Sequence, residues 1–291
     1  MRTIAELIMR GRVQAGAVAL LGTLLPFITP AAIALVTLRK GAFEGTLVLL
    51  IGLLPTILTF GANTDHQALV FLSTVISLIA VYISALVLRQ TVFWSSTLIT
   101  LLLVSILPLL LVTQLAPHAL GHLVDSLNVA LQTQATAADV ENPVPAINGI
   151  ALAGILAVVI IINGICSLFL GRWWQSLLYN PGGFRNEFRQ FRLGSITAAV
   201  CLTLSLYFLV QDDTYLTWSF VFALPLMLVS VAIVHTMVSS LKNARQCLII
   251  FYVTLIVLVI LQLANYVQIV LMGVGFLDHW LNFRSRKAQI S

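Results

Sequence analysis

Long uninterrupted runs of apolar residues constrain the fold of this chain more than any other feature. At ~1.5 Å of rise per residue, about 20 helical residues cross the ~30 Å hydrocarbon core of a bilayer. Strands of a membrane barrel would alternate apolar and polar side chains, and these runs do not alternate. The sequence therefore predicts an all-α, polytopic transmembrane helical bundle. The eight apolar runs are Val13–Leu38, Gly45–Phe60, Gln67–Leu88, Val92–Leu115, Ile147–Leu170, Gly194–Val210, Tyr215–Ser240 and Cys247–Leu277.

Composition and charge argue against a soluble domain and against a nucleic-acid-binding protein. Hydrophobic residues make up 60% of the chain and charged residues only 9%, whereas soluble domains carry about 25% charged residues. The net charge of +5 comes from single cations or small groups at the ends of apolar runs, where membrane topology places them. The expected partner is therefore the lipid bilayer, and no nucleic acid is expected.

The distribution of cations predicts the orientation of the chain. Segment 171–193 contains four arginines, whereas segment 116–146 contains no Lys or Arg at all. Cytoplasmic loops of membrane proteins carry the excess of Lys and Arg. We therefore expect 171–193 to be a cytoplasmic interfacial loop and 116–146 to be a periplasmic amphipathic segment. Both would belong to a single integral membrane domain, 1–291, in a bacterial inner (cytoplasmic) membrane.

Both ends of the chain conflict with eight simple crossings, because these would place the terminal arginines outside. Pro26 and Pro30 remove backbone donors and disfavour one straight helix through the first run. A re-entrant or broken first segment would return the N-terminus to the cytoplasm. The last run, Cys247–Leu277, would be about 46 Å long as one helix and has a polar middle, so we expect it to break. The expected number of spans is about six to eight.

The polar side chains deepest in the apolar runs are amides, and they are the candidate ligand-binding residues. Gln262, Asn265 and Gln268 fall in the last run, and Asn163 lies in the run before segment 171–193. A spacing of three residues puts Gln262 and Asn265 on one face of a continuous helix. Amides exposed to lipid are costly, so these side chains either bond to neighbouring helices or line a site for a neutral polar ligand. If the chain binds a ligand, these four residues are expected to contact it.

No motif for catalysis or cofactor binding occurs in the sequence. HExxH, GxSxG and GxxxxGK[ST] are all absent, and no soluble region is large enough for an ATPase domain. His118, His122 and Asp125 recur on one helical face, which fits either a metal-ligand trio or the solvated face of an amphipathic helix. We favour the solvated face. The chain is thus expected to be no enzyme and to have no catalytic residue, metal or cofactor.

Segment 171–193 also contains the candidate interface residues. Aromatic side chains and arginines at the end of an apolar run are typical of the membrane–water interface, and an Asn-Pro-Gly-Gly sequence favours a tight turn. We expect the turn to let the aromatic rings rest on the interface while the arginines contact headgroups or a partner protein. The predicted interface residues are Arg172, Trp173, Trp174, Tyr179, Asn180, Pro181, Gly182, Gly183, Phe184 and Arg185.

One local pattern resembles a known family. The strings Arg172-Trp173-Trp174-Gln175 and Leu178-Tyr179-Asn180-Pro181-Gly182-Gly183-Phe184 resemble those of the YybS-like family of bacterial membrane proteins. That family is similar to the substrate-binding membrane subunits of energy-coupling-factor transporters. The resemblance implies a compact helical bundle that holds a small ligand and docks onto a coupling subunit with ATPases. The chain has more apolar runs than the six spans usual for such subunits.

Two functions remain open at the level of the sequence. The leading expectation is a non-enzymatic small-molecule-binding or transport subunit. The alternative is a structural or assembly partner of another membrane protein complex, with no ligand of its own. Deep polar residues that converge on one cavity would favour the first function, and polar residues that pair with one another would favour the second.

The predicted orientation can be tested by cysteine labelling of intact cells. In a background without Cys166, Cys201 and Cys247, the variant Gln134→Cys should react with a membrane-impermeant maleimide added from outside. The variant Gln190→Cys should react only after the membrane is permeabilised. The reverse pattern would contradict the orientation.

Overall fold

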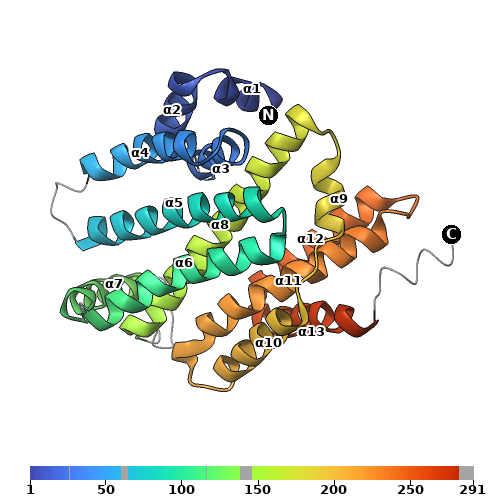
Figure 1. The fold of residues 1–291 in the computed structure, drawn as a ribbon. Coiled ribbons are helices and arrows are strands. Elements are labelled where there is room, and N and C mark those ends of the chain that lie inside the picture. Colours follow the sequence, from blue (N-terminus) through green and yellow to red (C-terminus); the bar gives the residue numbers. More distant parts are fainter. Residues whose placement is uncertain (26, 60–64, 116, 138–145, 282–291) are drawn as a thin grey trace. The chain divides into compact units, whose positions relative to one another are not determined.

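The structure is a computed structural model that describes residues 1–25, 27–59, 65–115, 117–137 and 146–281. Every element in these ranges is helical (Figure 1), so the predicted all-α class is confirmed for this part of the chain. The chain divides into two compact units, each with most of its contacts inside the unit. The expected single integral membrane domain stays a prediction. Unit 1 comprises Met1–Pro181 and Gln211–Trp218, and unit 2 comprises Gly182–Val210 and Ser219–Ser291.

The helices follow one another with short connections. Unit 1 contains α1 (Arg2–Arg10), α2 (Arg12–Leu21), η1 (Gly22–Leu24), α3 (Ile28–Lys40), α4 (Ala42–Thr59), α5 (Asp65–Thr91), α6 (Trp94–Leu115), α7 (Pro117–Ala137), α8 (Gly149–Tyr179) and η3 (Asp213–Tyr215). Unit 2 contains α9 (Gly183–Arg189), α10 (Ser195–Leu209), all but the first turn of α11 (Leu216–Val238), α12 (Ala244–Ile260) and α13 (Ala264–Leu281).

Within the described residues, five helices have the length and apolar composition to cross a membrane, which makes this chain a multi-pass membrane protein. Four further apolar helices are shorter and cover Arg12–Leu24, Ser195–Leu209, Ala244–Ile260 and Ala264–Asp278. The expected six to eight spans stay a prediction, because the number depends on which of the shorter helices cross. The five candidate spans are Ala42–Thr59, Val70–Thr91, Trp94–Leu115, Gly149–Tyr179 and Asp213–Val238.

The first apolar run is broken, as its prolines predicted. α2 has 10 residues and α3 has 13, so at ~1.5 Å per residue neither crosses a ~30 Å hydrocarbon core. Phe27, with a φ of 69°, precedes α3. The start of α3 lies against α2, where the Thr29 hydroxyl donates to the Ala19 carbonyl oxygen (2.7 Å). The start of α2 lies close to the segment that follows α3, because Arg12 Nε donates to Glu44 in the first turn of α4 (2.9 Å). α2 and α3 thus form a hairpin with both ends on one side of unit 1, the geometry of a re-entrant segment.

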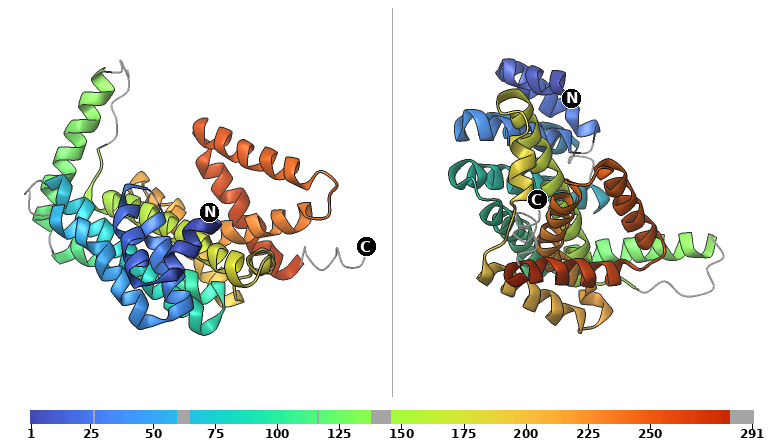
Figure 2. Two further views of the ribbon diagram at one scale, coloured as in Figure 1. Left: turned by 90° about the horizontal axis from the view of Figure 1, so that it is seen from above. Right: turned by 90° about the vertical axis from the view of Figure 1, so that its right-hand side faces the viewer.

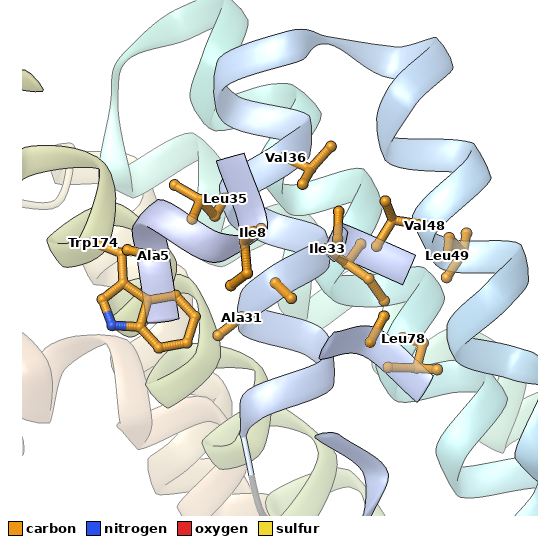
Figure 3. Close-up of a cluster of buried hydrophobic side chains, with 13 residues drawn as sticks. Ala5, Ile8, Ala31, Ile33, Leu35, Val36, Val48, Leu49, Leu78 and Trp174 are labelled. Atoms are coloured by element: carbon orange, nitrogen blue, oxygen red, sulfur yellow. The ribbon is translucent and has the colours of Figure 1, made fainter. Parts of the chain in front are cut away.

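α3 lies at the core of unit 1 (Figure 3). All residues from Thr29 to Leu38 are buried, as expected for a helix that is enclosed by other helices. Small residues let α8 approach closely, since a Cβ at Gly171 would lie 2.9 Å from the Ala34 Cβ and 3.0 Å from the Ala31 carbonyl oxygen. The part of the first apolar run from Thr29 to Leu38 therefore faces protein, and lipid has no access to that stretch.

Trp174 completes this core and corrects the expected interfacial loop. α8 continues as a helix to Tyr179, so the first part of that loop is helical. The Trp174 side chain is fully buried in the same cluster as Ala5 and Ile8 of α1 (Figure 3), and it cannot rest on a membrane interface. A position at the end of an apolar run does not reveal that a distant helix covers the side chain. Trp173 is 39% exposed and keeps the predicted accessibility.

In unit 2, α13 packs closely on α11. Gly275 permits this approach, since a Cβ there would lie 2.1 Å from the Leu226 carbonyl oxygen of α11. Close by, the Ser230 hydroxyl donates to the Leu271 carbonyl oxygen. α12, by contrast, buries none of its residues. The core of unit 2 therefore excludes α12.

The last apolar run breaks, as its length and polar middle predicted. α12 ends at Ile260 and α13 begins at Ala264, and Gln262 between them has a φ of 61°. This left-handed conformation is uncommon for a residue with a side chain and interrupts the helical hydrogen bonds. The two helices diverge from the junction (Figure 2).

The two adjacent tryptophans provide a matched test of the core. Trp174→Ala removes a fully buried indole and should destabilise the protein by about 3–5 kcal/mol. Trp173→Ala, one position earlier on α8, should cost far less, because its side chain is partly exposed. Thermal unfolding of both purified variants in mild detergent measures the difference. Equal losses of stability would contradict the burial of Trp174 beneath α1.

Candidate functional site

The predicted amide cluster does not gather in one place. Gln262 and Asn265 are exposed, whereas Gln268 is 1% exposed. The expectation that Gln262 and Asn265 share a helical face is wrong, because it assumed a continuous helix and Gln262 lies in the break between α12 and α13. Of the three amides in the last run, only Gln268 points into protein.

Gln268 joins three helices of unit 2. Its Nε2 donates to the Ser219 hydroxyl of α11 (2.7 Å) and to the Ser205 hydroxyl of α10 (3.3 Å). The two serines also bond to each other, because the Ser205 hydroxyl donates to the Ser219 carbonyl oxygen (2.9 Å) and the Ser219 hydroxyl to the Ser205 carbonyl oxygen (2.8 Å). A network of this kind satisfies buried polar groups and fixes one packing of the helices. The geometry at Gln268 is that of interhelical bonding.

Asn163, the fourth predicted ligand-binding residue, lies in unit 1 on α8. It is half-buried, and its Oδ1 accepts long hydrogen bonds from Ser77 of α5 (3.4 Å) and Ser167 (3.5 Å). Asn163 and Gln268 therefore belong to different units, each with serine partners of its own. Their role in binding a ligand stays a prediction.

A pocket in unit 1 lies between the end of α6, the side of α7 and the start of α8. Its volume is about 580 Å³, and α7, which forms one wall, projects from the other helices of unit 1 (Figure 2). Apolar residues from α7 and the start of α8 also line it. The polar residues of the lining are Thr113, Gln114, Asp125, Asn128 and Asn148, and Gly121 of α7 also lines the pocket.

Two asparagines fix the walls of this pocket. Asn128 bonds to both main-chain groups of Ile147, because its Nδ2 donates to the carbonyl oxygen (2.9 Å) and its Oδ1 accepts from the amide (2.8 Å). Asn148 caps α8, where its Oδ1 accepts from the Ala151 amide (2.9 Å), and its Nδ2 donates to the Thr214 hydroxyl (3.3 Å). Segments distant in sequence are thereby held together, as a preformed site requires.

The pocket suits a small molecule that is neutral or positively charged. Asp125 is the charged residue of its lining, and no Lys or Arg occurs between Arg89 and Arg172. The amide of Gln114 offers donors and an acceptor, and the hydroxyl of Thr113 can accept. An anionic ligand would meet a carboxylate without a neighbouring cation.

The possible metal-ligand trio falls partly at this pocket. Asp125 lines it, and His122 is exposed on α7, whereas the side chain of His118 lies outside the described residues. Among the residues that were searched, no group of three His, Cys, Asp or Glu could hold a metal ion.

The predicted interface residues in unit 1 are engaged within α8 and with α3. Arg172 Nη1 donates to Gln175 Oε1 (2.6 Å). The guanidinium of Arg39 lies 4.2 Å from the centre of the Tyr179 ring, a cation–π distance. The Asn180 carbonyl oxygen accepts from a hydroxyl one turn back on α8 (2.7 Å). Only the exposed part of this set is available to a partner.

The Asn-Pro-Gly-Gly turn contains the boundary between the two units, which falls after Pro181. Gly182 has a φ of 86°, which glycine adopts without the strain that a side chain would cause. Gly183 begins α9 with an ordinary backbone, so only Gly182 uses the conformational freedom of glycine in this turn. In unit 2, the Phe184 ring packs along α9, with its centroid 6.2 Å from that of the next phenylalanine, and Arg185 is exposed.

Sequence analysis missed a buried carboxylate in unit 2. The side chain of Asp278 is 2% exposed, and its Oδ2 lies 3.6 Å from Arg192 Nε. Asp278 follows the last apolar run and precedes the cationic C-terminus, a position typical of the aqueous flank, so only packing buries it. The pocket was missed for a related reason, because the polar residues of segment 116–146 fit a solvated surface equally well.

Comparisons with protein-family models, with curated proteins and with solved structures found no match for this chain. The resemblance to the YybS-like family therefore rests on the residues between Arg172 and Phe184. Any function must be inferred from the sites themselves.

The role of Gln268 can be separated from that of its neighbour Asn265. Gln268→Leu removes two hydrogen bonds, each worth ~0.6 kcal/mol on average inside a membrane protein, and should lower the thermal stability measurably. Asn265→Leu on the same helix is the control and should change stability little, because Asn265 is exposed. If Gln268→Leu is as stable as the wild type, the network does not hold the helices together.

Proposed function

We propose that this multi-pass membrane protein is a non-enzymatic small-molecule-binding or transport subunit of the bacterial inner membrane. The observation that carries the proposal is the pocket between α6, α7 and α8. Its volume of about 580 Å³ falls within the ~300–1,000 Å³ typical of small-molecule sites. Its hydrogen-bonded walls and mixed lining give a polar ligand both orientation and apolar contact.

The position of the pocket along α8 suits a subunit that takes up a ligand from outside. The pocket includes Gly149, the first residue of α8, whereas Tyr179 at the other end of this 31-residue helix lies beside Arg39. At ~1.5 Å per residue these ends are about 46 Å apart, enough to cross a bilayer. The positive-inside rule assigns the arginine end to the cytoplasm and the pocket to the periplasm.

The YybS-like resemblance supports the same function and adds a partner. A subunit of that kind would dock onto a coupling subunit with ATPases. The exposed residues of the predicted interface are accessible for such a contact, and they are Trp173, Tyr179, Asn180, Pro181, Gly182 and Arg185. Trp174 is excluded from such a contact by its burial.

A structural or assembly partner of another membrane complex is the alternative function. The hydrogen bonds of Gln268 with Ser205 and Ser219 favour it, because deep amides that pair with protein groups are expected for a scaffold. These bonds concern unit 2, however, and leave the pocket of unit 1 open to a ligand.

Filling the pocket tests the proposal. A Cβ at Gly121 meets no atom within 4 Å, so Gly121→Leu should place a side chain in the pocket without distorting α7. The small-molecule fraction released by denaturing the protein purified in mild detergent should raise the melting temperature of the wild type. It should fail to do so for Gly121→Leu. Gln132→Leu, exposed on the same helix, should respond like the wild type.

Mass spectrometry of the purified protein completes this experiment. A copurified small molecule that is lost in Gly121→Leu, together with a copurified ATPase pair, would support a transport subunit. Equal stabilisation of wild type and Gly121→Leu would place the ligand elsewhere. Absence of any stabilising small molecule, with a membrane-protein partner recovered, would favour the assembly function.

A further inference from the structure

Cationic side chains gather around the C-terminus of α3 in unit 1. Arg89, at the end of α5, donates from Nη1 to the carbonyl oxygens of Thr37 (3.1 Å) and Leu38 (3.4 Å). These carbonyl oxygens carry the negative end of the helix dipole and attract a cation. Arg39 and Lys40 form the last turn of the same helix. Three cations therefore meet at one helix end.

The acidic side chains at this end are already engaged by other arginines. Glu6 and Glu44 are the only acidic residues before position 65. Glu6 accepts from Arg2 (2.9 Å), and Glu44 accepts from Arg12 (2.9 Å). Glu44 also lies close enough to Lys40 for an electrostatic interaction, but it is already hydrogen-bonded to Arg12. The three cations at the end of α3 therefore carry an excess of positive charge.

Arg39 and Lys40 present this excess charge outward. Arg39 is exposed and Lys40 half-exposed, and neither makes an ion pair in the described residues. The Arg39 guanidinium lies over the Tyr179 ring at 4.2 Å. This contact uses the face of the guanidinium and leaves its N–H groups free at the edge, where they can donate in the bidentate manner that phosphate oxygens accept.

An apolar surface adjoins these cations. Phe43, three residues after Lys40, is 69% exposed at the start of the candidate span α4. Leu50 and Leu54, farther along α4, are also exposed. A ligand that bridges the two regions would carry a phosphate next to a hydrocarbon chain, which a lipid does and a free phosphate ion does not.

We propose that Arg39 and Lys40 bind the phosphate of an anionic lipid headgroup, with its acyl chain along α4. The contact of Arg39 with Tyr179 joins α3 to α8, and the hydrogen bond of Arg89 joins α5 to α3. The lipid headgroup would therefore lie where α3, α5 and α8 meet. Basic sites between helices on the cytoplasmic side of membrane proteins have the chemistry for such headgroups. The inference does not depend on the pocket or on its ligand.

Lipid-dependent stability of the purified protein tests the proposal. Micelles containing phosphatidylglycerol should raise the melting temperature of the wild type more than micelles with the same content of phosphatidylcholine. The double variant Arg39→Gln/Lys40→Gln should lose at least half of this difference. The matched control Lys242→Gln/Arg245→Gln removes two exposed cations of unit 2 and should keep it.

Further variants and additives distinguish an effect of charge from an effect on folding, and a lipid phosphate from a free phosphate ion. Arg39→Lys/Lys40→Arg keeps both charges and should retain the lipid effect. If the neutral double variant does not fold, Lys40→Gln alone should copurify with less phosphatidylglycerol, as measured by mass spectrometry. A full phosphatidylglycerol effect in the neutral variants, or no preference over phosphatidylcholine in the wild type, would overturn the proposal. Equal stabilisation by inorganic phosphate alone would assign the site to a free anion and overturn the lipid.

Discussion

The enclosure of α3 is the packing on which unit 1 depends. A helix that is buried on every side needs small neighbours, and Gly45, Gly52 and Gly171 provide them where α4 and α8 pass close to α3. Its C-terminal carbonyl oxygens still need partners, which Arg89 provides from α5. The hairpin of α2 and α3 is compatible with this enclosure, because polar backbone groups at a turn are tolerated at membrane depth only where protein surrounds them.

Polar side chains that bond to other protein groups hold segments together in both units, and a buried polar group is costly without such a partner. In unit 2, Gln268 and its two serines satisfy one another and bring α10, α11 and α13 together. In unit 1, Asn128 and Asn148 bond to main-chain groups and to Thr214 instead. Hydrogen bonding of polar side chains therefore joins three helices in unit 2 and fixes the walls of a pocket in unit 1.

The two ends of α8 have different chemistry. Its first residues line a pocket with one carboxylate, and its last turn lies beside Arg39 at the cationic end of α3. The two proposals follow this asymmetry, because the pocket suits neutral or cationic molecules and the cationic end of α3 suits anionic headgroups. The proposed ligand and the proposed lipid would therefore lie near opposite ends of the same long helix.

The sequence by itself determined the all-α class, the presence of apolar helices long enough to cross a membrane, and both breaks, because these follow from apolar length, proline and polar interruptions along the chain. Its choice of four amides as ligand-binding residues stays a prediction, and in the structure Gln262 and Asn265 are exposed while Gln268 bonds to serines. Only the tertiary structure decided that Trp174 is covered by α1 and that Asn128 meets Ile147 across a connecting segment. The periodicity of a sequence describes the faces of one helix. Burial and pockets depend on which helices pack together, and that packing is determined by contacts between residues far apart in the chain.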